Sequence, residues 1–214
     1  MGNFSLKFDK FWETFIKYNG YVKVLEGLKN TLTIAVLGLI IGIVIGTLIA
    51  TARVIPQYKV LPRILNKICS FYVALFRGTP IVVQLLVFYY VLLPLMGSRM
   101  TGIQVAVMVF GLNSAAYISE IMRGGIMSVD SGQMEAGRAV GLSFGTTMLK
   151  IVIPQAVKNI LPTMGNELIA LIKDTSVVSF VGATDLYVAF SFIGSSNYEF
   201  MVPYLVMALI YIVL

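Results

Sequence analysis

Several kinds of residue are scarce in this chain of 214 residues, and each shortage excludes a class of protein. There is no histidine and only one cysteine, Cys69, so an intrachain disulfide is excluded and a metal site built from His and Cys is not expected. Charged residues make up 12% of the chain, against about 25% in soluble domains. The phosphate-loop pattern G-x-x-x-x-G-K-[ST] does not occur, so we do not expect this chain to bind ATP by itself.

One short stretch matches a sequence motif of hydrolases. Gly141, Ser143 and Gly145 match G-x-S-x-G, the nucleophile elbow of hydrolases. The elbow requires a strand-turn-helix context and a general base, usually a histidine, which this chain does not contain. We therefore expect that the protein is not an enzyme.

Long apolar segments make up most of the sequence, since 58% of its residues are hydrophobic. A helix crosses a bilayer core with about 20 apolar residues. We predict an all-α membrane protein of about five transmembrane helices, with residues 1–214 forming a single domain. The expected spans are residues 28–52, 64–94, 102–126, 148–172 and a last span that begins near 198 or 203. The apolar run reaches Leu214, so we expect the natural chain to continue beyond it.

Two of these spans carry signals of a break. The residue before a proline is pushed out of helical geometry, so Arg77, Gly78, Thr79 and Pro80 predict that one helix ends near Phe76 and that the next begins at Pro80. Two further prolines, at 154 and 162, predict a bent or broken helix within 148–172.

Three other segments have distinct patterns. Gly38, Gly42 and Gly46 form overlapping G-x-x-x-G patterns, which permit close helix contact either within the subunit or at a dimer seam. Residues 1–27 are expected to form an amphipathic N-terminal segment, because aromatic residues recur there at helical spacing among lysines. Residues 174–197 are expected to include a short helix outside the spans, as part of a gate or an extracellular cap.

The net charge of +6 is assigned to Lys and Arg that face anionic lipid, rather than to a nucleic-acid partner. The loop after the first span carries four basic residues and no acidic one, which indicates a cytoplasmic position. The N-terminal segment is also basic, with five lysines against three acidic residues. Charge alone therefore leaves the orientation undecided.

The segment from Asp130 to Pro154 begins with polar residues and lies between strongly apolar ones. Asp130 and Ser131 can cap the free backbone N–H groups of a helix, and Glu135 follows in its first turns, where the helix dipole favours a negative charge. A short exposed helix is therefore predicted here.

This segment carries a family resemblance. Its residues follow the pattern E-A-A-x3-G-x9-I-x-L-P, with Gly for the third residue and Ile for the Leu; the matching positions are Glu135, Ala136, Gly137, Gly141, Ile151, Ile153 and Pro154. The pattern resembles the EAA loop of the membrane subunits of bacterial ABC importers, which forms a cytoplasmic coupling helix in a groove of the ATPase subunit. The resemblance implies a cytoplasmic loop at 130–147 in which ATPase coupling falls to Glu135, Ala136, Gly137, Arg138 and Gly141. The small Gly141 is expected to let the helix approach its partner closely.

A second resemblance comes from the phrase FRGTP, followed by Gln84, Tyr89 and Tyr90, which is similar to the polar amino acid subfamily of these permeases. Together the two resemblances imply a type I importer fold. They also imply two ABC ATPase subunits that bind the ATP and Mg, a second permease subunit, an extracytoplasmic solute-binding protein, and no cofactor in this chain. The second permease subunit is either an identical copy or a close paralogue. The resemblance to the EAA loop further implies that the N-terminus lies outside and that the protein is a multi-pass chain of the bacterial cytoplasmic (inner) membrane.

Polar residues within the spans are the candidates for a substrate site. Asn113, Tyr117 and Glu120 share one helix face, and Glu120 either pairs with Arg123 or lies on the substrate path. An ionised carboxylate at the bilayer centre costs on the order of 2.5 to 3.5 kcal/mol, so Glu167 requires compensation. The candidate substrate-binding residues are Asn113, Ser114, Tyr117, Glu120, Met164, Asn166 and Glu167.

These candidates favour a cationic amino acid, since more of them are acidic than basic. Met164 could contact an aliphatic stem, although ordinary packing is the favoured explanation for it. The alternative function is a stand-alone secondary transporter or channel that uses Glu120 or Glu167 as an ion or proton site. The absence of repeated halves in the sequence is unfavourable to that alternative.

Overall fold

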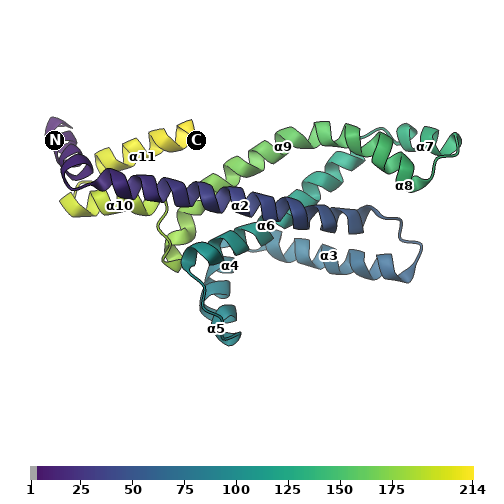
Figure 1. The fold of residues 1–214 in the computed structure, drawn as a ribbon, viewed down its shortest axis with the longest axis horizontal. Coiled ribbons are helices and arrows are strands. Elements are labelled where there is room, and N and C mark those ends of the chain that lie inside the picture. Colours follow the sequence, from purple (N-terminus) through teal and green to yellow (C-terminus); the bar gives the residue numbers. More distant parts are fainter. Residues whose placement is uncertain (1–3) are drawn as a thin grey trace. The chain divides into compact units, whose positions relative to one another are not determined.

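The structure is a computed structural model that describes residues 4–214, and within that range all regular elements are helices. Short π-helical (η1, η2, η3) and 3-10 (η4) stretches lie between or beside the α-helices. In chain order (Figure 1) the elements are α1 (Phe4–Trp12), η1 (Glu13–Lys17), α2 (Gly20–Val54), α3 (Val60–Gly78), α4 (Ile81–Val87), η2 (Phe88–Leu92), α5 (Leu93–Leu95), α6 (Gly102–Met127), α7 (Ser131–Ala139), α8 (Phe144–Thr147), η3 (Met148–Val152), α9 (Ile153–Asp174), η4 (Thr175–Val181), α10 (Leu186–Asn197) and α11 (Met201–Val213).

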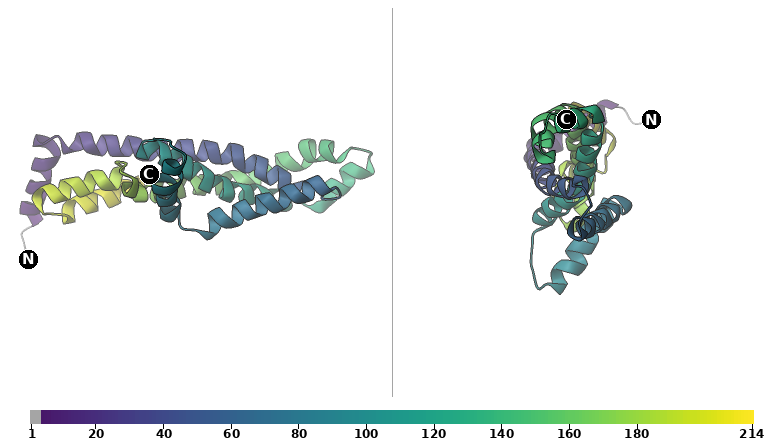
Figure 2. Two further views of the ribbon diagram at one scale, coloured as in Figure 1. Left: turned by 90° about the horizontal axis from the view of Figure 1, so that it is seen from below. Right: turned by 90° about the vertical axis from the view of Figure 1, so that its right-hand side faces the viewer.

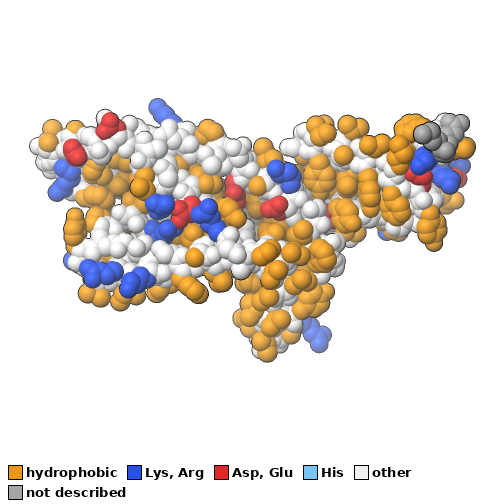
Figure 3. All heavy atoms as spheres, turned by 180° about the vertical axis from the view of Figure 1, so that it is seen from behind, with side chains coloured by type: hydrophobic (Ala, Val, Ile, Leu, Met, Phe, Trp, Pro, Cys, Tyr) orange, Lys and Arg blue, Asp and Glu red, His pale blue; other side chains and the backbone are white. Residues whose placement is uncertain are grey.

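Length and composition identify the membrane spans. Within residues 4–214, α2 and α6 are each long and apolar enough to cross a membrane, and two interrupted helix pairs raise the number to four if each pair is one span. The pairs are Val60–Gly78 with Ile81–Leu95 and Phe144–Val181 with Leu186–Asn197, and α11 is a shorter apolar helix. Hydrophobic side chains cover much of the face displayed in Figure 3, whereas charged side chains gather in a few places. The predicted all-α membrane class is thus confirmed.

Internal contacts divide the chain into two compact units. The first comprises the described part of Met1–Leu37 together with Val82–Val109 and Ile169–Leu214. The second comprises Gly38–Ile81 and Phe110–Leu168. The helices α2, α6 and α9 each contribute residues to both units.

In the first unit, α1 packs against α10 and α11 (Figure 2). Asn197 at the end of α10 donates to the Lys10 carbonyl at 2.8 Å, and the Lys7 ammonium lies 3.3 Å from the Glu199 carboxylate. α10 begins at Leu186, and the side chain of the preceding Asp185 caps it by accepting from the N–H groups of Tyr187 and Val188. The buried apolar residues of this unit form a core of Phe11, Val24, Leu186, Ala189, Phe190, Ile193 and Val202.

The N-terminal segment differs from the prediction in one respect. The first long helix begins at Gly20, eight residues before the expected start at Leu28, and runs without a break to Val54. The turn before it is made at Asn19, whose φ of 54° lies in the left-handed region that asparagine tolerates. The expected amphipathic segment therefore consists of α1, η1 and the first turns of α2, while residues 1–3 lie outside the described part. A short helix is present within 174–197 as α10, whereas its expected place outside the spans, in a gate or an extracellular cap, stays a prediction.

The glycine stripe of α2 lies in the second unit and faces α6 of the same chain. A Cβ at Gly42 would lie 2.7 Å from Ser114 Oγ, and one at Gly46 would lie 2.9 Å from the Ala115 carbonyl oxygen. At Gly38 the nearest atom would be the Cβ of Phe110, at 3.2 Å. The stripe therefore serves packing within the subunit, which was one of the two alternatives.

The two predicted helix breaks have different outcomes. α3 ends at Gly78 and α4 begins at Ile81, with Thr79 in an extended conformation before Pro80, so the first break is confirmed. Of the two alternatives predicted at Pro162, the broken helix is wrong, because α9 continues through Pro162 from Ile153 to Asp174, and the bent helix stays a prediction. Pro154 is the second residue of α9 and lies just after the π-helical stretch η3, which continues directly into α9.

Candidate functional site

The coupling segment folds as a capped helix. The Asp130 carboxylate accepts from the Gly132 N–H at 2.7 Å, and the Asp130 carbonyl accepts from the Gln133 N–H at 3.0 Å. These bonds satisfy donors that the first turn of α7 leaves free. The prediction of an N-terminal cap at Asp130 is confirmed.

The end of α7 depends on Gly141. Its φ of 86° lies in the left-handed region, and its N–H donates to the Arg138 carbonyl while the Leu142 N–H donates to the Gly137 carbonyl. These two bonds form the Schellman motif, in which a glycine follows the helix end. Gly141 is thus required by the turn itself, which differs from the reason expected from sequence, close approach to a partner. The close approach of Gly141 to a partner stays a prediction.

The remaining coupling residues separate into two faces of α7. Gly137 is buried, and a Cβ there would lie 2.4 Å from the Thr147 side chain. Glu135, Ala136 and Arg138 are exposed, and the Arg138 guanidinium donates to the Leu142 carbonyl at 3.1 Å. The exposed side of α7 therefore carries the charged Glu135 and Arg138 together with the small apolar Ala136.

The helices α6 and α9 bring two candidate substrate residues together in the second unit. The buried Ser114 hydroxyl of α6 donates to Glu167 Oε1 of α9 at 3.0 Å. Asn113, one position earlier, is buried and donates to the Phe76 carbonyl of α3 at 3.3 Å. Met164 and Glu167 are half-buried on α9, and Asn166 is exposed.

Tyr117, the next polar residue along α6, is 37% exposed and lies under the guanidinium of Arg77, 5.2 Å from the ring centroid. This separation is within the range of a cation-π contact. Arg77 was read from sequence as part of the helix break and of the FRGTP phrase, so its contact with a candidate site residue was missed.

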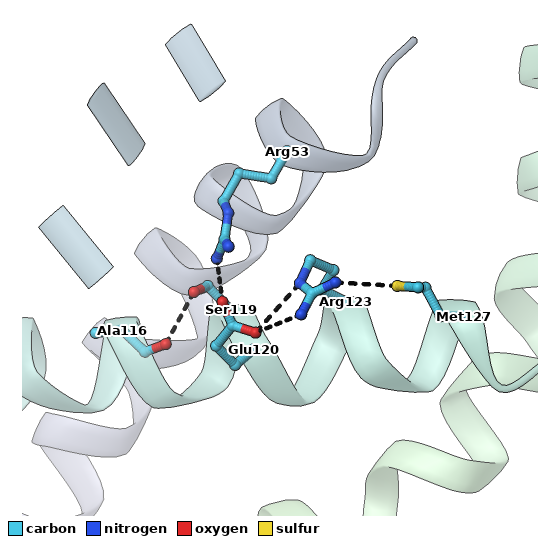
Figure 4. Close-up of polar contacts among 6 residues, drawn as sticks. All are labelled: Arg53, Ala116, Ser119, Glu120, Arg123 and Met127. Atoms are coloured by element: carbon cyan, nitrogen blue, oxygen red, sulfur yellow. Dashed lines mark hydrogen bonds and ion pairs between the residues drawn. The ribbon is translucent and has the colours of Figure 1, made fainter. Parts of the chain in front are cut away.

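Glu120 lies between two arginines, one on each side (Figure 4). Its Oε1 pairs with Arg53 Nη1 from α2, and its Oε2 lies 2.9 Å from Arg123 Nη2, one turn further along α6. The side chains of Arg53 and Glu120 are mostly buried, with 14% and 19% exposed. The structural pairing of Glu120 with Arg123 is therefore present, and the second partner, Arg53, was missed because it lies 67 positions away in sequence.

A shallow hollow of about 420 Å³ lies beside Glu120 between α6 and α9. Gly124, Gly125 and Ser128 line it from α6 or its end, and Asn159 and Thr163 line it from α9. Asn159 donates to Ser128 Oγ at 2.9 Å, and a Cβ at Gly125 would lie 2.3 Å from Ile160. The two helices are thus in direct contact close to the coupling segment.

Among residues 4–214 no group of three or more His, Cys, Asp or Glu side chains is placed to hold a metal ion.

A family comparison accounts for this arrangement. Residues 38–214 match the model of the family described as "Binding-protein-dependent transport system inner membrane component". The chain belongs to this family. The matched range includes α6, α7 and α9, and hence all candidate site residues of this transport-system membrane component.

Individual relatives agree with this assignment. The chain is 39% identical over 191 residues to the arginine transport system permease protein ArtQ of Bacillus subtilis (strain 168), covering 89% of this chain and 85% of that protein. It is 37% identical over 204 residues to the putative glutamine transport system permease protein GlnP of Rickettsia bellii (strain RML369-C), covering 95% and 91%.

Among solved structures, an amino acid ABC transporter crystallised with histidines matches with a TM-score of 0.83 at 36% identity, covering 94% of this chain and 90% of that one. The family resemblance and the permease fold expected from sequence are confirmed. Nothing in these comparisons supports the alternative of a stand-alone secondary transporter or channel.

Proposed function

We propose that this chain is the transmembrane subunit of an ATP-driven importer that moves polar, chiefly basic, amino acids into the cell. The observation that carries this function is the position of α7, a capped and exposed helix with the EAA-like sequence between the apolar helices α6 and α9. Membership of the transport family and the arginine and glutamine permeases among its relatives support the same function.

In this function α7 is the coupling helix. Glu135, Ala136 and Arg138 form its exposed face toward a groove of a separate ATPase chain, and Gly137 and Gly141 set its packing and its end. Two such ATPase subunits bind the ATP and Mg and hydrolyse the nucleotide. Their closure pushes the coupling helices of two permease subunits together, and the membrane helices rock from inward to outward access.

The solute path runs between α6 and α9. Glu167 accepts a hydrogen bond from an ammonium or guanidinium group, as it accepts one from the Ser114 hydroxyl here. Asn113, Tyr117 and Asn166 add groups that donate or accept, and Met164 contacts the aliphatic stem of the solute. Glu120 lies on the same path, but its charge is already balanced by Arg53 and Arg123, so we assign recognition of the cation to Glu167.

The remaining assignments complete the transporter. Residues 1–214 form one permease domain in the bacterial inner membrane, with the N-terminus outside and residues 130–147 in the cytoplasm. A second permease subunit, identical or paralogous, completes the path, and an extracytoplasmic binding protein delivers the solute.

Co-purification of the tagged chain from its native membrane, followed by an ATPase assay in lipid, tests this function. We expect a stoichiometric ATPase that is stimulated by a binding protein loaded with a basic amino acid. A chain that purifies alone and moves solute on an ion gradient would refute the importer.

Glu167→Gln tests the recognition of charge. It should weaken transport of a cationic amino acid about tenfold more than that of a neutral one, since a hydrogen bond to a charged group contributes about 1.5 to 3 kcal/mol. Val157→Ala, a change at an exposed apolar residue of the same helix, is the matched control. Equal losses for both solutes would remove Glu167 from the recognition of charge.

A further inference from the structure

The third residue of the EAA-like sequence is a glycine here, and the fold gives this glycine a specific neighbour. Gly137 is buried in α7, and a Cβ added to it would lie 2.4 Å from Cγ2 and 2.9 Å from Oγ1 of Thr147. Real Cβ contacts are essentially never shorter than 3.0 Å. The alanine of the family pattern therefore does not fit against Thr147 in this arrangement.

Thr147 has little freedom to make room. Its side chain is fully buried, and its hydroxyl donates to the Ser143 carbonyl at 3.0 Å. A β-branched side chain in a helix has few χ1 rotamers, and this hydrogen bond selects one of them. The methyl group of Thr147 is therefore held against Gly137.

The position of Thr147 links α7 to the membrane helix. Thr147 is the last residue of α8, the next residue begins η3, and η3 continues directly into α9. α7 contacts both α8 and η3 (Figure 2), and Gln155 of α9 donates to the Gln133 side chain of α7 at 3.4 Å. The base of α9 is thus the surface on which α7 rests.

The exposed face of α7 is positioned by the same contact. Glu135 lies two residues before Gly137, which corresponds to about 200° around a helix of 3.6 residues per turn. Glu135 is accordingly exposed on the side of α7 opposite to Thr147. Any displacement of α7 away from Thr147 moves the face that carries Glu135.

We propose that Thr147 is a positioning residue for energy coupling. Its methyl group occupies the space that an alanine at position 137 would need, and the pair sets the height and tilt of α7 on the base of α9. This inference rests on the proposed function, in which α7 engages an ATPase. It leads to an unexpected consequence: restoring the alanine of the family pattern at Gly137 impairs coupling in this protein.

The test compares single and double variants in the complete transporter, reconstituted in lipid with its ATPase and binding protein. Gly137→Ala must move α7 by about 1 Å to reach an ordinary contact with Thr147. An error of about 1 Å at reacting atoms can cost on the order of 100-fold, and a helix in a groove is more tolerant, so we expect about a tenfold loss of solute moved per ATP hydrolysed.

Thr147→Ser in the same chain removes the methyl group, which makes the shorter contact at 2.4 Å, and keeps the hydroxyl, whose contact at 2.9 Å needs only a small shift. The double variant should therefore recover to within about threefold of the wild type, which a general loss of stability would not do. Gly145→Ala is the matched control, because a Cβ at Gly145 has open space around it, and it should leave the ratio unchanged. Thr147→Ser alone loosens the contact and should lower the ratio about threefold, as repacking of a small gap does.

The outcomes separate this inference from the function on which it rests. The positioning role is overturned if Gly137→Ala moves as much solute per ATP hydrolysed as the wild type. It is also overturned if adding Thr147→Ser does not relieve the loss in Gly137→Ala. If Gly137→Ala does not assemble, Thr147→Ser alone decides, and an unchanged ratio in that variant overturns the role. Failure of the coupling-helix assignment has a different signature, namely normal ATPase binding and normal coupling in Glu135→Lys.

Discussion

Two short helices outside the long spans, α1 and α7, use their faces in opposite ways. α1 buries an aromatic residue, Phe11, in the core of the first unit and exposes further aromatic residues, whereas α7 buries a glycine and exposes charged and small residues. Phe8 and Trp12 on the exposed side of α1 stack with ring centroids 6.1 Å apart. Aromatic residues flanked by lysines suit the membrane interface, and a mixed charged face suits a protein groove. Under the proposed function, the exposed face, rather than helix length or capping, is what separates the lipid contact of α1 from the subunit contact of α7.

The largest expected effect concerns how α1 is held. Phe11→Ala removes a buried ring from the core and should lower the free energy of unfolding by about 3 to 5 kcal/mol. Phe8→Ala, on the exposed side of the same helix, should change the free energy of unfolding by no more than about 0.5 kcal/mol. Denaturant unfolding in detergent measures both variants, and equal shifts would show that the two faces of α1 do not differ.

The second prediction reverses one charge in each helix. Glu135→Lys places a cation on the exposed face of α7 and should reduce ATPase co-purification at least about tenfold, since juxtaposed like charges at an interface cost several kcal/mol. Lys10→Glu makes the opposite change on α1 and should leave ATPase binding intact. Quantitative co-purification checks both, and loss of the ATPase in Lys10→Glu would break the distinction between the two helices.

The third prediction concerns the start of α7. Asp130→Ala removes the N-cap acceptor of the Gly132 N–H, which contributes about 1 kcal/mol. Amide hydrogen exchange in the first turn of α7 should accelerate about fivefold, because 1 kcal/mol corresponds to about that factor. Asp9→Ala within α1 is the control and should not change exchange in α7. Unchanged exchange at Gly132 in Asp130→Ala would show that the cap does not limit opening of this turn.

The smallest perturbation uses a natural probe, because Trp12 is the only tryptophan of the chain. It is exposed on α1, so in lipid vesicles its fluorescence should be quenched by brominated lipid more than by aqueous iodide. A tryptophan introduced by Ala136→Trp in a Trp12→Phe background should show the reverse preference in the chain without its ATPase. Quenching of Trp12 mainly from water would remove the lipid contact of α1 from the comparison.

Local rules predicted much of the fold. Asp130 as a cap, the break at Thr79 and Pro80, and the α10 helix all depend on neighbours within a few residues, and the structure confirms each of them. A broken helix at Pro162 was one of two predicted alternatives and is not observed, because the rule for proline gives a tendency that packing along a long helix can override.

Contacts between distant residues limited the prediction of the site. The pairing of Arg53 with Glu120 and the packing of Gly125 on Ile160 join helices whose relative register no sequence pattern encodes. Arg53 was visible as the first charged residue after the apolar run of α2, but nothing identified its partner. Gly137 was recognised by its place in the family pattern, whereas its neighbour Thr147 could be found only from the fold.

The close approach of Gly42 to Ser114 has a consequence for how solute preference can change. Gly42 lies on α2, behind the residue whose hydroxyl meets Glu167, and any larger side chain there would press on that hydroxyl. A substitution at Gly42 would therefore redirect the Ser114 hydrogen bond without adding any group to the solute path. Under the proposed function, in which Glu167 recognises the solute, a substitution at Gly42 would change preference among amino acids although Gly42 itself does not touch the solute.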